Sequence, residues 1–136
     1  MHLEIHDKTK LKDIQKVFSD YYPYLSISFF KGHHELYENS PIAYEINPEK
    51  TIAEIRKTHI STILEIRPWY RVKDVEKEFQ ERIGISVQIL KKEKEAWEQT
   101  TGLDQLSLKD LNILGRNSSD EFVVTDYDES FGQEEF

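Results

Sequence analysis

Residues 3–18 read LEIHDKTKLKDIQKVF, and residues 64–79 read LEIRPWYRVKDVEKEF. At an offset of 61, seven of the sixteen positions are identical, and several others keep their chemistry. An internal period of this kind defines the structural unit before any other pattern is read. The chain is therefore predicted to contain two repeats, over residues 2–59 and 63–115.

The match continues beyond these two stretches. ELYENS (residues 35–40) aligns with EAWEQT (residues 95–100) at an offset of 60, and TIAEI (residues 51–55) aligns with SLKDL (residues 107–111) at an offset of 56. The last pair opens with a hydroxyl residue followed three positions later by a carboxylate, which is typical of the capping box at a helix start. Each copy is therefore expected to end in a short helix.

The spacing of apolar residues predicts the other elements of each repeat. Leu3 and Ile5 alternate with polar neighbours, as in a strand, whereas Leu11, Ile14 and Phe18 recur at the spacing of a helix. A helix stop and a further strand with a polar turn follow, and the second copy repeats the pattern. Pro23 and Gly84 are the predicted helix stops, and residues 25–29 and 85–89 are the predicted strands.

These elements predict an α+β fold made of two β-α-β-β-α units with pseudo-two-fold symmetry. A strand, a helix and a strand joined by short loops normally form a right-handed parallel crossover. We therefore expect a mixed sheet with the helices packed on one face, and one core shared by both copies because each is too small to be stable alone. An elaborated ferredoxin-like arrangement is the alternative.

Charge divides the chain into a body and a tail. The net charge is −8, and residues 117–136 contain seven carboxylates and neither Lys nor Arg. Residues 1–116 hold 18 basic and 19 acidic residues and are almost neutral. We expect residues 1–116 to form one folded domain that ends after Gly115, the predicted stop of the last helix. Residues 117–136 are expected to form an acidic, largely flexible tail.

Composition also indicates the cellular location of the protein and excludes some kinds of chemistry. The chain has no cysteine, which excludes disulfides and thiol nucleophiles. Its start is polar and charged, without the apolar segment of a secretory signal, and no window is long and apolar enough to span a membrane. A cytoplasmic protein is expected, with no membrane partner. The near-neutral body has no basic stripe to attract nucleic acid.

Two segments, FSDYYPYLSISFF (residues 18–30) and FQERIGISVQILKKEKEAWEQTTGLDQLSLKDLN (residues 79–112), resemble a family of small uncharacterised bacterial proteins. That family pairs an aromatic-Pro-Tyr-Leu strand with a Gly-x-x-Val-Gln strand, which is followed by Trp and a Thr-Thr pair. The resemblance covers most of the body but not the tail, and Leu106 stands where the family has Trp. It implies no activity, cofactor or catalytic residue.

The largest difference between the copies is RPWYR, which replaces HDKTK between a strand and a helix. Aromatic side chains between two arginines can form a recognition surface for an acidic or aromatic partner. Alternatively, Trp69 and Tyr70 close one end of the core. The candidate binding residues are Arg67, Trp69, Tyr70 and Arg71.

A second, polar candidate site rests on carboxylates and histidines. Glu38 and Glu98 are equivalent in the repeat, so a two-fold axis could bring them together for acid/base chemistry or cation binding. His33 and His34 occur in the first copy alone and could ligate a transition metal. The alternative without a site is that the glutamates occupy outward-facing strand positions and that the histidines lie in an exposed turn.

No combination of acid, base and nucleophile stands out in the chain. The sequence therefore favours a non-enzymatic interaction or regulatory module, whose partner is another protein, its own acidic tail or a second copy. The alternative is a small enzyme, or a binder of a small molecule or metal, with a site at the junction of the repeats. We expect neither a cofactor nor a bound metal.

Overall fold

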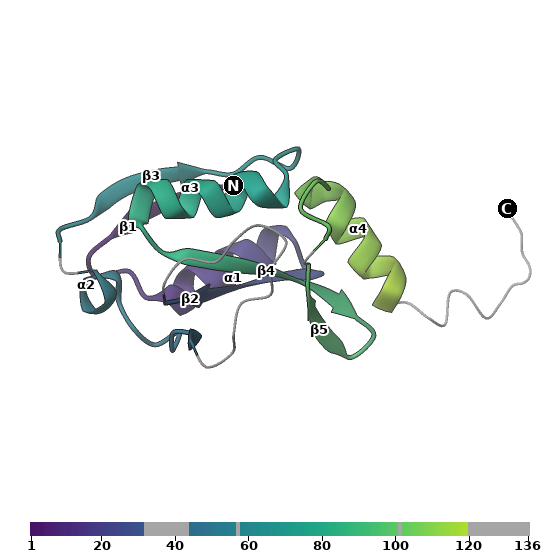
Figure 1. Cartoon of the computed structure of the whole chain (residues 1–136), viewed down its shortest axis with the longest axis horizontal. Helices are drawn as coiled ribbons and strands as arrows, with labels where there is room; N and C mark the ends of the chain where they lie inside the picture. Colours follow the sequence, from purple (N-terminus) through teal and green to yellow (C-terminus); the bar gives the residue numbers. More distant parts are fainter. Residues whose placement is uncertain (32–43, 57, 101, 120–136) are drawn as a thin grey trace, which may run out of the picture.

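The computed structural model describes residues 1–31, 44–56, 58–100 and 102–119. Within these ranges the chain forms an α+β fold of four helices and five strands. The strands lie in two small antiparallel sheets, against which helices pack (Figure 1). The predicted α+β class is confirmed.

The smaller sheet pairs β1 (His2–His6) with β3 (Ser61–Glu65). The strands are antiparallel, and Leu3 lies opposite Leu64. Burial alternates along β1, where Leu3 and Ile5 are buried and their neighbours are exposed. This is the period of two that the sequence predicted.

The larger sheet has the order β2 (Leu25–Phe30), β4 (Ser86–Glu93) and β5 (Ala96–Gln99). Both pairings are antiparallel, and Ile27 lies opposite Ile89 at the centre of the sheet. The predicted strands of the second copy are confirmed. The sequence also predicts a return strand at residues 35–40, equivalent to residues 95–100, and this prediction lies outside the described residues.

The predicted mixed sheet is wrong for the described part of the chain, where every strand pair is antiparallel. The prediction placed β1 and β2, which flank a helix, side by side in one sheet. Instead β1 pairs with β3 and β2 pairs with β4, so the helix between β1 and β2 connects two different sheets. Each pairing joins the two halves of the chain, and the apolar strand faces of both halves are thereby buried together.

Helix α1 (Leu11–Tyr21) buries Leu11, Ile14 and Phe18 along one stripe, as the apolar spacing predicts. The helix ends where it was expected to. Tyr22, with φ −130°, leaves the helical region because the ring of the following Pro23 disfavours a helical conformation in the residue before it.

Helix α3 (Val72–Ile83) follows the same pattern in the second half of the chain and buries an equivalent apolar stripe. It ends at Gly84, whose φ of +68° lies in the left-handed region that glycine adopts without strain. The Gly84 amide donates hydrogen bonds to the carbonyls of Phe79 and Gln80, both at 3.0 Å. The predicted stop is confirmed.

The short helix α2 (Ile52–Ile55) begins with the predicted capping box. The Glu54 amide donates to Thr51 Oγ1 at 3.3 Å, and the Thr51 amide donates to Glu54 Oε1 at 2.8 Å. Both backbone donors at the helix start therefore have partners. In the second half, the Asp110 amide donates to Ser107 Oγ at 3.1 Å at the start of the next helix.

That last helix, α4 (Leu108–Ser119), does not stop at Gly115, so this prediction is wrong. Gly115 is buried in the helix interior, where a Cβ atom would lie 2.9 Å from the carbonyl oxygen of Tyr24. The glycine is therefore a point of close packing against the start of β2. The helix runs three residues past the predicted boundary at Arg116, and residues 120–136 lie outside the described residues.

One hydrophobic core takes residues from both sheets and from all four helices. At its centre the ring of Phe29 on β2 meets the ring of Phe79 on α3 edge to face, with 5.9 Å between the ring centroids. Both side chains are almost completely buried. The expected single core is confirmed for the described residues.

Candidate functional site

The first candidate site, the RPWYR stretch, forms a turn between β3 and α3. The Tyr70 amide donates to the Arg67 carbonyl at 3.0 Å, which closes the turn and directs its tip into solvent. Trp69 is 69 % exposed, whereas Tyr70 is partly buried and packs against the core. Closing the end of the core is thus a role for Tyr70, and Trp69 presents its ring to solvent.

The two arginines of this turn reach different neighbours. Arg67 Nη2 lies 3.4 Å from Glu65 Oε1, and both side chains are substantially exposed. Arg71 Nη1 donates to Gln105 Oε1 at 3.0 Å, and the Arg71 amide donates to Asp74 Oδ2 at 3.0 Å. Exposed ion pairs of the first kind contribute about 0–1 kcal/mol. Arg67 is therefore available to a partner at little cost, while Arg71 helps to hold the start of α3.

Of the second candidate site, Glu98 is the one residue that lies among the described residues. Glu98 lies on β5, exposed, with Oε1 3.6 Å from Lys91 Nζ. His33, His34 and Glu38 lie outside the described residues. Within the described ranges, no group of three or more histidines and carboxylates is placed to hold a metal ion.

Lys91, which neighbours Glu98, is unusual for a charged residue because its side chain is only 7 % exposed. Its Nζ donates to Glu93 Oε1 at 2.7 Å, and this hydrogen bond is the main reason why the pKa of Glu93 lies below its ordinary value. A nearly buried ammonium needs such partners. Glu98 is therefore explained as a second counter-ion of Lys91.

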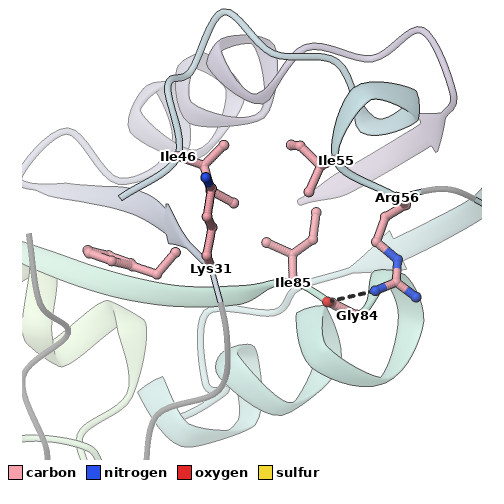
Figure 2. Close-up of a pocket in the computed structure, with 7 residues that line it drawn as sticks. Lys31, Ile46, Ile55, Arg56, Gly84 and Ile85 are labelled. Atoms are coloured by element: carbon pink, nitrogen blue, oxygen red, sulfur yellow. Dashed lines mark hydrogen bonds between the residues drawn. The ribbon is translucent and has the colours of Figure 1, made fainter. Parts of the chain in front are cut away.

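A cavity of about 220 Å³ lies where the ends of β2 and α2 meet the start of β4 (Figure 2). Figure 2 shows Lys31 and Ile46 on one side of it and Ile55 and Arg56 on the other. Its walls are apolar except for the two cationic side chains and the backbone. The lining residues are Phe30, Lys31, Ile46, Ile55, Arg56, Gly84 and Ile85.

The guanidinium of Arg56 lies over Gly84 in this cavity. Its Nη1 donates a long hydrogen bond of 3.4 Å to the Gly84 carbonyl, and its buried Nε has no hydrogen-bond partner among the described residues. A Cβ atom at Gly84 would lie 2.9 Å from Arg56 Cζ. The glycine that ends α3 thus also makes room for the guanidinium.

Sequence reasoning missed Lys31 and Arg56 as site residues. Lys31 directly follows the apolar end of β2, and Arg56 directly follows α2. A cation immediately after each of two apolar segments was the available signal. It carried no information on its own, because the two residues are 25 positions apart.

Comparison of the chain with protein-family models, with curated proteins and with solved structures finds no match. The resemblance to a family of small bacterial proteins therefore stays a prediction. In the described part of the chain, none of the helices has the length and apolar character needed to cross a membrane.

Proposed function

We propose that this protein is a non-enzymatic interaction or regulatory module that binds an acidic, aromatic protein segment on a surface centred on Trp69. The observation that carries the proposal is the 69 % exposure of this side chain in a turn flanked by arginines. Tryptophan and arginine are the residue types that dominate binding energy at protein interfaces. In the free protein the exposed ring leaves apolar surface in water, which a partner would remove.

The surface extends from the turn along α4. The Lys109 amide donates to the Pro68 carbonyl at 3.0 Å, which places the first turn of α4 next to Trp69. Ile113 and Arg116 follow Lys109 at spacings of four and three, so the three exposed residues share one face of the helix. The Trp69 surface is defined by Arg67, Trp69, Lys109, Ile113 and Arg116.

The chain carries a segment of complementary chemistry in residues 120–136. These residues include seven carboxylates, four aromatic residues and no Lys or Arg. From the end of α4 at Ser119 back to its start at Leu108 is about 17 Å, which an extended chain covers in about five residues. The segment is therefore long enough to reach Trp69. We assign it as the occupant, in the same molecule or on a second copy.

Removal of residues 120–136 tests this assignment through the fluorescence of Trp69. The Trp97→Phe substitution first leaves Trp69 as the sole tryptophan. Truncation after Ser119 is expected to shift its emission to the red and to increase quenching by acrylamide, because docked carboxylates and rings shield the indole. Addition of the 120–136 peptide should reverse both changes, less so at high salt.

Two controls make the outcome decisive. A peptide with every Asp and Glu replaced by Asn and Gln should bind weakly, since the proposal depends on charge. The solution size before and after truncation tells docking within one molecule from docking on a second copy. If Trp69 emission is unchanged by truncation and the peptide does not bind, the assignment is wrong.

We further propose that the fold is an internal duplication with a pseudo-two-fold axis. Its support begins with strand register. Leu3 and Leu64, which are equivalent at the offset of 61, lie opposite each other in the smaller sheet. In the larger sheet the offset of 60 makes Ile27 equivalent to Val87 and Phe29 equivalent to Ile89. The cross-strand pair Ile27–Ile89 is therefore equivalent to the cross-strand pair Phe29–Val87. A two-fold relation between the copies requires equivalent strands that meet to pair antiparallel, as both of these pairs do.

Backbone hydrogen bonds at the start of the helices give a second, independent support. The Leu11 amide donates to the Lys50 carbonyl at 3.0 Å, and the equivalent Val72 amide donates to the Leu106 carbonyl at 3.2 Å. In the reverse direction two further bonds match, each at 2.9 Å. They run from the Ile52 amide to the Thr9 carbonyl and from the Leu108 amide to the Tyr70 carbonyl.

Two further hydrogen bonds change the alignment of the two proposed copies after the strands β2 and β4. The Ile46 amide donates to the Phe29 carbonyl at 2.7 Å, and the Thr100 amide donates to the Ile89 carbonyl at 3.3 Å. These bonds relate the two segments by an offset of 54 rather than 60. Tyr44, and not Glu38, then corresponds to Glu98, which weakens the argument for a pair of equivalent glutamates.

A small-molecule binder with a site at the junction of the copies is the second candidate function. The observation that favours it is the cavity between Arg56 and Ile85, because its walls come from both proposed copies. This candidate and the Trp69 surface occupy different parts of the molecule and can coexist.

A further inference from the structure

The cavity beside Arg56 combines an incompletely bonded guanidinium with isoleucine walls. We infer that it binds a small organic carboxylate with a branched, apolar body. This inference deepens the second candidate function, since it names the ligand class of that site. It is independent of the Trp69 surface.

The guanidinium supplies the first argument. Arg56 Nε is buried without a partner among the described residues, and the bond from Nη1 to the Gly84 carbonyl is long at 3.4 Å. Buried polar atoms in folded proteins are normally hydrogen-bonded, and a guanidinium offers five donors in one plane. A carboxylate accepts two parallel N–H bonds from such a group and carries the opposite charge. It would therefore supply an acceptor to a guanidinium whose Nε has none among the described residues.

The walls supply the second argument. Four of the lining side chains are apolar, and three of them, Phe30, Ile46 and Ile85, are at most 5 % exposed. An inorganic anion would make little contact with this apolar lining, whereas a branched hydrocarbon body would lie against the isoleucines. The volume of about 220 Å³ lies below the roughly 300–1,000 Å³ of pockets for drug-sized ligands. The ligand must therefore be small.

Lys31 supplies the third argument. It is exposed and lies opposite Arg56 across the cavity (Figure 2). A cation at the rim raises the local concentration of anions. Together the two residues select for negative charge. The competing explanation is that Arg56 only caps the carboxyl end of α3, where cations are favourable, and in that case no carboxylate binds.

The test is a titration of the full chain, labelled with ¹³C at the isoleucine methyl groups, and monitored by NMR. The probe is isovalerate. Acetate is the control that keeps the carboxylate but lacks the branched hydrocarbon group, and 3-methylbutanol is the control that keeps the branched group but has no charge. Isovalerate should shift the methyl signals of Ile46, Ile55 and Ile85 saturably, with a dissociation constant in the millimolar range expected for so few atoms. Acetate and the alcohol should each bind about tenfold more weakly or not at all.

Substitutions locate the site. Arg56→Gln should abolish the isovalerate shifts, whereas Arg82→Gln, which removes an exposed arginine on the neighbouring α3, should leave them unchanged. Ile55→Phe fills the cavity without touching a charge and should also abolish them. Methyl spectra without ligand show whether each variant is folded.

The comparison of ligands on the unchanged protein does not depend on any variant. Equal binding of 3-methylbutanol and isovalerate would overturn the carboxylate inference and leave a small-molecule site for apolar ligands. Absence of saturable shifts with all three probes at about 50 mM would overturn the inference and the second candidate together. Neither result bears on the Trp69 surface.

Discussion

Asp7 shows how a single carboxylate ties two loops together. Its Oδ1 accepts a hydrogen bond of 2.8 Å from the Ile60 amide, and its Oδ2 lies 2.6 Å from His59 Nδ1. The bond from the backbone amide, followed by the contact with His59, holds the pKa of Asp7 below its ordinary value. The ionised side chain thus connects the end of β1 to the segment that leads into β3.

This pKa predicts how Asp7→Asn depends on pH. A carboxyl whose pKa is lower in the folded chain stabilises the fold above its unfolded pKa, and this contribution disappears as the pH falls through the folded pKa. At pH 7 the variant should therefore have a lower free energy of unfolding than the parent. The difference should shrink below about pH 4, as measured by urea unfolding across pH.

Asp20→Asn is the matched control, since Asp20 meets the exposed Lys16 within α1. Pairs of this kind contribute about 0.3–0.5 kcal/mol, so a smaller difference at pH 7 is expected. A difference for Asp7→Asn that persists at pH 2 would point to lost packing instead of lost charge.

At the scale of elements, the approach of α4 to β2 depends on Gly115. The Tyr24 amide donates to Asn112 Oδ1 at 2.9 Å, one turn before the glycine on the same helix. A side chain at Gly115 would collide with the Tyr24 carbonyl and with the stem of Lys91. The hydrogen bond to Tyr24 and the absence of a side chain at Gly115 therefore let α4 pack against the start of β2 at close range.

Gly115→Ala should consequently destabilise the protein. Alanine favours a helix over glycine by about 1 kcal/mol, but the contact of 2.9 Å with a backbone oxygen forces α4 away from β2. A net loss of about 1–3 kcal/mol in the free energy of unfolding is expected, as for other overpacked sites. Asn117→Ala, at an exposed position of the same helix, should be neutral or slightly stabilising in the same urea measurement. A stabilised Gly115→Ala variant would mean that helix propensity outweighs the close contact.

At the scale of the whole molecule, the sheets join the two halves of the chain. β1 has its partner in β3, and β2 has its partner in β4, so both of these pairs need strands from both halves, whereas the β4–β5 pair lies within the second half. The central ring contact between Phe29 and Phe79 also crosses between the halves. Stability is therefore a shared property of both halves.

Division of the chain between residues 57 and 58 tests this dependence. The two fragments should each be largely unfolded by circular dichroism, because small units bury too little apolar surface to be stable. Mixed at equal concentration, they should recover helical signal and a cooperative thermal transition. A cooperative transition in the fragment 1–57 alone would show that one half folds independently.

Local patterns predicted most of the elements correctly. The apolar spacing located α1 and α3, Pro23 and Gly84 located their ends, and the hydroxyl residues located the starts of α2 and α4. These features depend on interactions within a few residues, which the sequence displays directly. Gly115 was misread because the same residue type ends helices and permits close packing, and only its neighbour Tyr24 distinguishes the two.

The candidate site was predictable in part. RPWYR stood out as a difference between the two predicted repeats, but the exposure of Trp69 and the burial of Tyr70 depend on how the turn lies against the core. Lys31 and Arg56 gave no usable signal, because a cavity is formed by residues far apart in the chain.

By itself, then, the sequence determined the α+β class, the extent of most helices and strands, and the contrast between a near-neutral body and an acidic end. Tertiary structure alone decided that β1 joins β3 and that β2 joins β4, and it placed Arg56 and Lys31 around one cavity. The physical reason is the distance along the sequence between the residues that interact. Periodicity, caps and turns express energies between neighbours in sequence, whereas strand pairing and cavities depend on contacts between distant residues that form when the whole core is buried.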